Sequence, residues 1–469
     1  MNFLIVLYGG WLALSRLRRL VLLFPVLCLF TPKGLGLIDV PALPYLSVNR
    51  ALVLVMLGAY ALQAMANGWR LKRSAFPFSG PFGLMAVGYL CTWALNPARW
   101  SSDTVTGAME FIEVFLPCYL VFRFCDSPAA ARRTLRYFYL VAVAVSLYGT
   151  LAYFAHANPY FDYLQHTTPT GRVLAKDYSD SVRGMRAVGT LSHPITYGAF
   201  QVYAFIVGIF LHRDRRHAGR VALFLAMQLV LFVGIVVTNS RTPLIFLLLS
   251  ICVFVILASS KDRLFFAQVG AVALAVVCLA GLEYVERFAD FVASTFSNDA
   301  AASRNGSSLV MRLGQMAVAW SFFVQSPLFG NGITMSRDIV ASGKYPDFYN
   351  AESALFQWMI DLGLIGLTSF VWLFGRIYAS ARQRIGDRTR YAAINAMVTG
   401  YILFVLATGV LETMQLFLVL IALLLVASRP EVGRIDPDRT QTRQRAPART
   451  GCAASPAPRR PGGVRRDKP

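Results

Sequence analysis

Long apolar runs recur from one end of this chain to the other, separated by short polar or basic stretches. A membrane-spanning helix needs roughly 20 mostly apolar residues, and many of these runs approach that length. Of the 469 residues, 56% are hydrophobic and only 15% are charged, with a mean hydropathy of +0.53. A soluble chain of this length would instead cover several cores with charged residues. We therefore predict an all-α, polytopic membrane protein.

Charge and turn signals divide the apolar runs into about twelve expected transmembrane helices. The expected spans are residues 20–30 with their flanks, 46–66, 80–96, 105–124, 135–155, 194–212, 219–238, 241–258, 264–285, 353–380, 391–411 and 414–428. The run from Met1 to Leu14 is too short for a full span, which favours an interfacial or re-entrant segment. It also lacks a basic start and a cleavage site, so a cleaved signal peptide is not expected.

The basic residues give this arrangement a direction, because Lys and Arg accumulate in cytoplasmic loops. Alternation of about twelve spans places the basic clusters, and both termini, on the cytoplasmic side. The clusters are RLRR at 16–19, RLKR at 70–73, ARR at 131–133, HRDRRH at 212–217, KDR at 261–263, and the stretch 376–390. The net charge of +21 therefore reflects topology and does not indicate a nucleic-acid partner.

The chain divides into a transmembrane domain, residues 1–428, and a tail, residues 429–469. The tail is rich in Arg, Pro, Gly and Ala, which predicts a disordered, basic, cytoplasmic segment. It either is solvated and enforces the topology or contacts anionic lipid headgroups. The cysteines and histidines form no metal-binding pattern, so we expect no metal and no cofactor.

Two long connections fall on the outer, periplasmic side: residues 156–193 and 286–352. Loops of this length are usually functional or disordered. The second contains MRLGQMAVAWSFFVQSPLFGNGI, in which five apolar residues share one helical face. These residues are Leu313, Met316, Ala317, Trp320 and Phe323. We predict an amphipathic helix lying on the outer membrane surface.

The outer side also carries arginines, which topology normally keeps scarce there. They are Arg172, Arg183, Arg186, Arg241, Arg304, Arg312 and Arg337, accompanied by Lys176. Arg241 lies in the short turn TNSRTP between two apolar runs. Such arginines either extend toward lipid phosphates or form a pocket for an anionic group, since guanidinium groups suit phosphate oxygens.

Glu352 lies at the outer mouth, within the expected first turn of the helix that begins near Ser353. One interpretation is structural: Asn350 or Ser353 caps the helix while Glu352 complements the helix dipole or forms a salt bridge to an outer arginine. The other is a general base beside an arginine-lined phosphate site.

Four motifs in the second half of the chain resemble the O-antigen ligase and O-antigen polymerase superfamily. They are RAVGTLSHPITYGAF from Arg186, TNSRTPL from Thr238, RLGQMAVAWSFFVQSPLFGNGI from Arg312, and ESALFQWMIDLGLIG from Glu352. The resemblance implies a metal-independent, inverting glycosyltransferase of the bacterial inner membrane whose active site faces the periplasm. Its donor would be a glycan on undecaprenyl diphosphate. Its acceptor would be another glycan or the lipid A core, in O-antigen, lipopolysaccharide or exopolysaccharide synthesis.

The resemblance also assigns roles to individual residues. Arg186 and Arg241 would hold the diphosphate, and Arg312 would assist them or order the loop. Members of the ligase branch begin the corresponding helix with a His-Asn pair, whereas Glu352 and Ser353 stand here. This departure favours a polymerase, with Glu352 as the base and a chain-length regulator as a further expected partner.

His193 is the other candidate base, although HP before an apolar run is equally typical of a helix entry. A secondary transporter or flippase is the alternative from another class. It would place ionisable residues near the bilayer midplane. Glu110 and Glu113, on one helix face, are the residues that fit it, and we expect them to face the bundle interior or a cavity. A structural partner of an export complex, without chemistry of its own, is a third reading.

Overall fold

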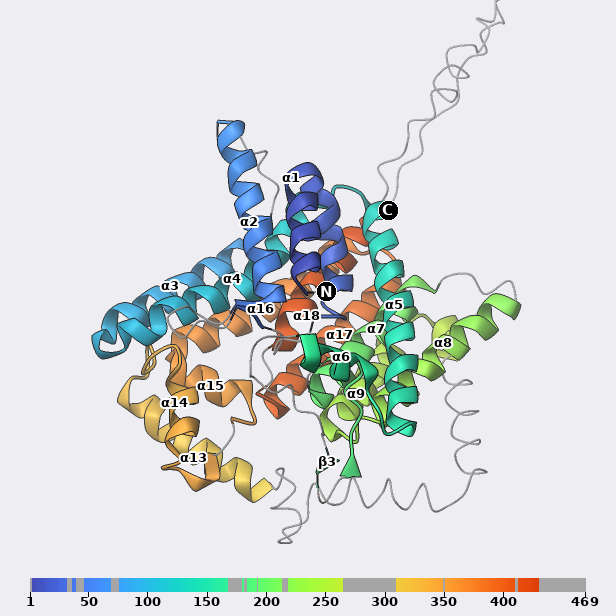
Figure 1. Cartoon of the computed structure of the whole chain (residues 1–469). Helices are drawn as coiled ribbons and strands as arrows, with labels where there is room; N and C mark the ends of the chain where they lie inside the picture. Colours follow the sequence, from blue (N-terminus) through green and yellow to red (C-terminus); the bar gives the residue numbers. More distant parts are fainter. Residues whose placement is uncertain are drawn as a thin grey trace, which may run out of the picture. The chain divides into compact units, whose positions relative to one another are not determined.

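The computed structural model describes eleven stretches of the chain (Figure 1). They are residues 2–31, 36–38, 46–68, 76–167, 179–180, 184–191, 193–212, 218–264, 309–348, 351–409 and 412–429. Met1–Arg429 forms one compact unit. The expected tail lies, beyond Arg429, outside the described residues.

The described residues are mostly helical, as the sequence predicts. The helices are α1 (Asn2–Leu27), α2 (Val48–Ala66), α3 (Ser79–Leu95), α4 (Trp100–Phe124), α5 (Pro128–Phe154), α6 (Pro159–Thr167), α7 (Pro194–Leu211), α8 (Ala218–Val236), α9 (Arg241–Leu257), α13 (Leu309–Gln325), α14 (Met335–Ser342), α15 (Ala354–Asp361), α16 (Gly363–Arg384), α17 (Arg388–Ala407) and α18 (Glu412–Ala427). Two 3₁₀ turns, η1 (Pro97–Arg99) and η2 (Pro346–Phe348), complete the helical elements.

Two short antiparallel strand pairs depart from the all-α expectation. β1 (Gly36–Ile38) pairs with β2 (Leu46–Ser47), and β3 (Ser179–Asp180) pairs with β4 (Gly184–Met185). The second pair and α6 lie in the connection 156–193, which the sequence predicted only as a long outer loop.

Several helices begin where a side chain can accept a hydrogen bond from the first turn. Ser47, Ser127, Ser353 and Asp387 cap α2, α5, α15 and α17 in this way. Such caps satisfy backbone N–H groups that have no partner inside the helix. The local sequence thus fixes where these helices start.

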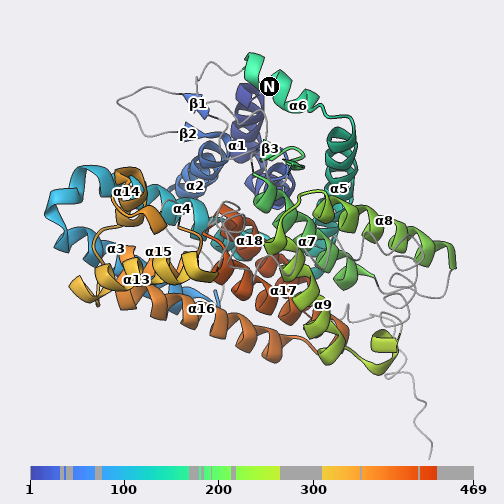
Figure 2. The same ribbon diagram turned by 90° about the horizontal axis from the view of Figure 1, so that it is seen from below.

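The core is built around α18, whose residues from Thr413 to Ala427 are all buried. Figure 2 shows α18 and α17 among α7, α9 and α16. Tyr401 of α17 stacks on Phe417 of α18 with ring centroids 3.9 Å apart. In α7, a Cβ at Gly198 would lie 2.7 Å from Pro243 of α9, so these two helices approach closely because the glycine lacks a side chain.

Among the described residues, seven helices are long and apolar enough to cross a membrane. These segments are Val48–Ala66, Pro97–Phe124, Pro128–Phe154, Pro194–Leu211, Ala218–Val236, Gly363–Arg384 and Arg388–Ala407. The shorter helices α9 and α18 are also apolar. The protein is therefore a multi-pass membrane protein, and the count of about twelve stays a prediction. In the expected span 264–285, all residues after Leu264 lie outside the described residues.

Two expected segments have different boundaries. The run from Met1 to Leu14 is helical and belongs to α1, which has a kink at Arg16 (φ −151°, ψ 60°) that divides it into two helical pieces. The span 353–380 is wrong as a single helix, because α15 ends at Asp361 and α16 begins at Gly363.

The break between α15 and α16 is a docking point for residues 326–337, which we call the docking segment. Leu364 and Ile365 donate backbone hydrogen bonds to Pro327 (2.8 Å) and Leu328 (3.1 Å), and Asn331 donates one to Ile360 (2.9 Å). Gly363 has a left-handed φ of 60°. The chain therefore changes direction between α15 and α16, and the backbone N–H groups of Leu364 and Ile365 bind the docking segment.

The connection 286–352 contains α13 and α14, which share a small core with α15. It consists of Ala319, Phe322, Ile339, Phe348, Ala351, Phe356 and Ile360. The predicted apolar face of α13 points away from it: Leu313, Met316 and Trp320 are 53%, 49% and 56% exposed. A helix is present as predicted, with an apolar face open to its surroundings. Its position at a membrane surface stays a prediction.

We expect Gly363→Ala to lower the stability of the protein by about 1–3 kcal/mol, because an L side chain strains this backbone conformation. The added Cβ would also lie 2.7 Å from the backbone of Gly330 and Pro327. The matched control is Gly375→Ala in the same helix α16, where a Cβ meets no atom within 4 Å. Thermal unfolding in detergent would measure both, and equal melting temperatures would contradict this account of the break.

Candidate functional site

Arg312 of α13 and Glu352 form an ion pair at the start of α15. Nε of Arg312 lies 3.9 Å from Oε2 of Glu352, and the side chains are 33% and 16% exposed. Nη2 of Arg312 donates a hydrogen bond to the carbonyl of Ala407, at the end of α17 (3.1 Å). The pair is thus held against the membrane helices, with a separation longer than a hydrogen bond.

Glu352 precedes the helix and does not lie in its first turn, which corrects the sequence prediction. Ser353 is the N-cap, and its hydroxyl accepts from Leu355 N–H (3.2 Å). The backbone N–H of Glu352 donates to Oε1 of Gln315 (3.2 Å), and Ala354 N–H donates to the carbonyl of Thr408 (3.2 Å). These bonds fix the backbone on both sides of Glu352. Of the two residues considered as the cap of this helix, Ser353 is therefore the one that caps it.

Arg186 and Arg241 meet at the turn between α8 and α9. Nε of Arg186 donates to the carbonyl of Thr238 (3.2 Å), and its Nη2 donates to the hydroxyl of Ser240. Ser240 is the N-cap residue of α9, and Arg241 is the first residue of that helix. The two guanidinium-bearing residues therefore converge from different parts of the sequence on one helix N-terminus, where the helix dipole also favours an anion.

His193 caps α7, as expected for a helix entry. Its Nδ1 accepts a hydrogen bond from Ile195 N–H (3.2 Å). Because Nδ1 acts as an acceptor, the neutral ring carries its proton on Nε2. Burial, and then the positive charge of Arg186, lower the pKa of His193 to about 4. The ring is therefore neutral near pH 7.

Both groups of residues lie at the same end of the helix bundle. At the opposite end, Nε of Arg388, which begins α17, donates to the carbonyl of Leu257, which ends α9 (3.0 Å). The guanidinium of Arg390 lies over Phe210, near the end of α7 (5.5 Å). Since α17 therefore runs antiparallel to α7 and α9, its end at Ala407 lies at the end where α7 and α9 begin. The structure thus gathers all five predicted site residues at one end of three helices.

Sequence reasoning missed three carboxylates on this side. Asp103 (1% exposed) accepts hydrogen bonds from Ile333 N–H (2.9 Å) and the Thr334 hydroxyl (2.8 Å). Asp361 accepts from both the N–H and the hydroxyl of Ser336, each at 2.7 Å. An acidic residue inside an apolar run is costly, and that cost is the signal that could have found Asp361, which lies in the expected span 353–380. Asp103 precedes the expected span 105–124 and has no such signal.

The third missed carboxylate is Glu412, the first residue of α18. Its Oε1 accepts a hydrogen bond from the hydroxyl of Thr196, in the first turn of α7. Glu412 is therefore bonded to the first turn of α7, the helix that His193 caps. Its position between two expected spans is no signal of a functional role.

The two acidic residues that suggested a transporter both have arginine partners. Glu113 is 2.7 Å from Nε of Arg50, and their side chains are 9% and 16% exposed. Glu110 is 2.8 Å from Nη2 of Arg337, a residue of the docking segment. Glu113 faces the interior as expected, and Glu110 links α4 to the docking segment through its ion pair with Arg337.

Four of the predicted outer cations, Arg172, Lys176, Arg183 and Arg304, lie outside the described residues. In the described part of the chain, no three His, Cys, Asp or Glu side chains are grouped to hold a metal ion. The candidate site therefore consists of arginines, one histidine and carboxylates. This composition suits an anionic substrate group and a proton acceptor.

Residues 226–371 match the family described as O-antigen ligase. This match supports the predicted resemblance to the O-antigen ligase and O-antigen polymerase superfamily. The match extends from α8 into α16 and includes Arg241, Arg312 and Glu352, whereas Arg186 and His193 precede it. No curated protein matches the chain. The match thus covers the part of the chain that contributes most of the candidate site.

We expect acid to destabilise the protein through His193. The folded-state pKa of about 4 lies below the ordinary value near 6.5, so between these values the unfolded chain binds more protons. Stability is therefore full above about pH 6.5 and falls as the pH drops toward 4. His193→Asn retains a capping acceptor and removes the titration.

Melting temperatures between pH 7 and pH 4.5 test this expectation. The wild type should lose more than the variant as the pH falls, and the two should melt similarly at pH 7. An identical pH dependence would mean that the buried ring is not responsible.

Proposed function

We propose that the chain is a bacterial inner-membrane glycosyltransferase that transfers a glycan from undecaprenyl diphosphate to an acceptor glycan on the periplasmic side. The observation that carries the proposal is the gathering of Arg186, Arg241, Arg312 and Glu352 at one end of α7, α9 and α17. The family match supplies the class of reaction, which serves the synthesis of a surface polysaccharide.

The arginines would bind the diphosphate of the donor. Arg186 and Arg241 approach the N-terminus of α9, where backbone N–H groups add to the positive potential. His193 would contribute an Nε2–H donor, because its Nδ1 is engaged by the helix cap. As the glycosidic bond breaks, negative charge grows on the leaving diphosphate, and preorganised donors stabilise it.

Glu352 would be the general base. An acceptor hydroxyl attacks the anomeric carbon, a new C–O bond forms with inversion, and the bond to the diphosphate oxygen breaks. The hydroxyl proton passes to the Glu352 carboxylate, and the electron pair of the broken bond leaves with the diphosphate. The step needs no metal ion, because arginines offset the charge. His193 fits the base role less well, since the tautomer that caps α7 has its proton on Nε2.

We favour a lipid-linked glycan as the acceptor, which makes the protein a polymerase of O-antigen or exopolysaccharide. The carboxylate at position 352, where the ligase branch has histidine, supports this choice. Ligation to the lipid A core is the second candidate, because the matching family is described as O-antigen ligase. A chain-length regulator would be a partner of the polymerase only.

The arginine partners of Glu110 and Glu113 weigh against the transporter alternative. A transport site needs ionisable groups that exchange partners during the cycle. Here Glu113 is bound to Arg50 within the bundle, and Glu110 holds the docking segment through Arg337. Each carboxylate therefore has a structural role, which does not require transport.

We expect Glu352→Gln to slow transfer by about 10²- to 10⁴-fold, the usual contribution of a general base. The protein, reconstituted in liposomes, would receive a lipid-diphosphate-linked oligosaccharide with or without a lipid A core. The matched control is Asp126→Asn, which neutralises another carboxylate paired with an arginine, Arg18 (3.3 Å).

A ladder of longer lipid-linked glycans without the core would identify a polymerase. Product only with the core would identify a ligase. An undiminished rate in Glu352→Gln would remove Glu352 from the reaction. Glycolipid crossing the bilayer unchanged, with no product, would replace the enzyme by a transporter.

A further inference from the structure

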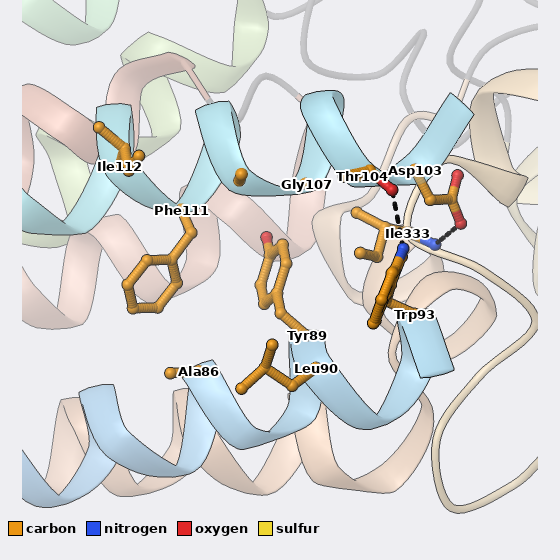
Figure 3. Close-up of a pocket in the computed structure, with 11 residues that line it drawn as sticks. Ala86, Tyr89, Leu90, Trp93, Asp103, Thr104, Gly107, Phe111, Ile112 and Ile333 are labelled. Carbon is orange, nitrogen blue, oxygen red and sulfur yellow. Dashed lines mark hydrogen bonds between the residues drawn. The ribbon is translucent and has the colours of Figure 1, made fainter. Parts of the chain in front are cut away.

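A cavity of about 420 Å³ lies between α3 and α4, away from the arginines of the candidate site. Figure 3 shows Tyr89, Leu90 and Trp93 of α3 facing Phe111 and Ile112 of α4 across it. Its lining is almost wholly apolar. The volume lies near the lower end of the range for small-molecule sites, about 300–1,000 Å³.

The rim of the cavity is apolar enough to face a bilayer. α4 belongs to a segment long and apolar enough to cross a membrane. Leu90, on the rim, is 63% exposed. At the outer end, Trp93 stacks on Trp100 with centroids 5.3 Å apart, and stacked indoles of this kind are typical of the membrane–water interface. An apolar cavity that opens on this surface is accessible to lipid chains.

Charge also limits what can occupy the cavity. At its outer end, Arg99 is already bound to Asp103 (3.4 Å) and Asp338 (2.6 Å). Arg337 is bound to Glu110 (2.8 Å). These carboxylates outnumber the guanidinium groups, so the end of the cavity does not favour an anionic headgroup. The complementary occupant is the hydrocarbon part of a lipid.

The docking segment closes the outer end of the cavity with Ile333. Asp103 accepts the backbone hydrogen bond of Ile333, as the dashed line in Figure 3 shows (2.9 Å). Gly107 makes room for its side chain, because a Cβ there would lie 2.6 Å from Cδ1 of Ile333. A chain in the cavity would therefore touch the segment that packs against α15, the helix that follows Glu352.

We propose that the α3–α4 cavity binds one hydrocarbon chain of a lipid, with Ile333 of the docking segment as its outer wall. The chain comes from one of two sources that share this chemistry: the prenyl chain of a lipid-linked donor or an acyl chain of the bilayer. Only the first source rests on the proposed function. In either case, occupancy of the cavity contacts the connection that carries Arg312 and Glu352.

Photo-crosslinking of the full-length protein in phosphatidylethanolamine–phosphatidylglycerol vesicles tests the proposal. One arm uses a polyprenyl diphosphate with a diazirine on its chain, and the other uses a phospholipid with a diazirine in one acyl chain. Ala86→Trp fills the cavity from α3, and Ala108→Trp fills it from α4. The matched control is Val87→Trp, at a neighbouring position that is 49% exposed and does not line the cavity.

We expect labelling of α3 and α4 peptides to fall about tenfold in either filling variant, equivalent to about 1.4 kcal/mol of binding, and to persist in Val87→Trp. Labelling by the prenyl probe assigns the cavity to the donor, and labelling by the acyl probe alone assigns it to bilayer lipid. Equal labelling in the filling variants and the control, or no labelling of α3 and α4, would overturn the proposal.

Melting temperatures of the variants would show that each is folded. Two filling variants on opposite walls keep the test decisive if one of them fails to fold. Labelling needs no turnover, so Glu352→Gln should be labelled like the wild type. A failure of the proposed transfer reaction is thereby distinguishable from a failure of the cavity to bind lipid.

Discussion

The arrangement of the docking segment depends on one buried carboxylate, Asp103. A desolvated carboxylate is costly unless its oxygens accept hydrogen bonds, and both oxygens of Asp103 do so. The donors are Ile333 and Thr334 of the docking segment, so satisfying Asp103 fixes that segment on α4. Asp361 repeats the arrangement with Ser336 at the end of α15. Asp103 and Asp361 thus hold the docking segment against α4 and α15.

The position of the candidate site follows from this attachment. The docking segment occupies the break at Gly363, and α15 continues from that break back to Ser353 and Glu352. Arg312, on α13, donates a hydrogen bond to the carbonyl of Ala407, the last residue of α17. The ion pair of Arg312 and Glu352 is therefore held from two sides. The arginines near the start of α9 are positioned separately, by the turn that follows α8.

Much of this arrangement could be predicted from the sequence where a local signal is strong. Apolar runs predicted most helices, the basic loops predicted a topology, and motif order predicted the superfamily, which the family match confirms. The exposed apolar face of α13 follows from the spacing of Leu313, Met316 and Trp320. The meeting of all five site residues at one end of the bundle follows from antiparallel helices, once their ends are known.

The remaining features depend on contacts between distant residues. Gly363, with its left-handed φ of 60°, is a local signal that can end a helix at Asp361. Glycine alone does not decide the break, because Gly366 lies inside α16 and the break is also stabilised by the docking segment more than 20 residues earlier. The role of Asp103 could not be predicted from the local sequence either, because its hydrogen-bond donors lie 230 and 231 positions away. The sequence predicts Glu352 in the first turn, whereas it lies one residue before the N-cap, because Ser353 and Glu352 are both plausible at a helix start. Only the observed cap distinguishes them.

The most direct test of the account is whether its arginines bind a lipid diphosphate. Binding of undecaprenyl diphosphate without a glycan would be measured on the purified wild type and on Arg186→Gln and Arg241→Gln. Arg132→Gln is the control, since Arg132 bonds to Ala427 at the far end of α18 (3.0 Å). The account predicts that each site variant weakens binding about tenfold to 100-fold, the effect of losing a charged hydrogen bond, while the control binds normally. Equal affinity in all four proteins would contradict it.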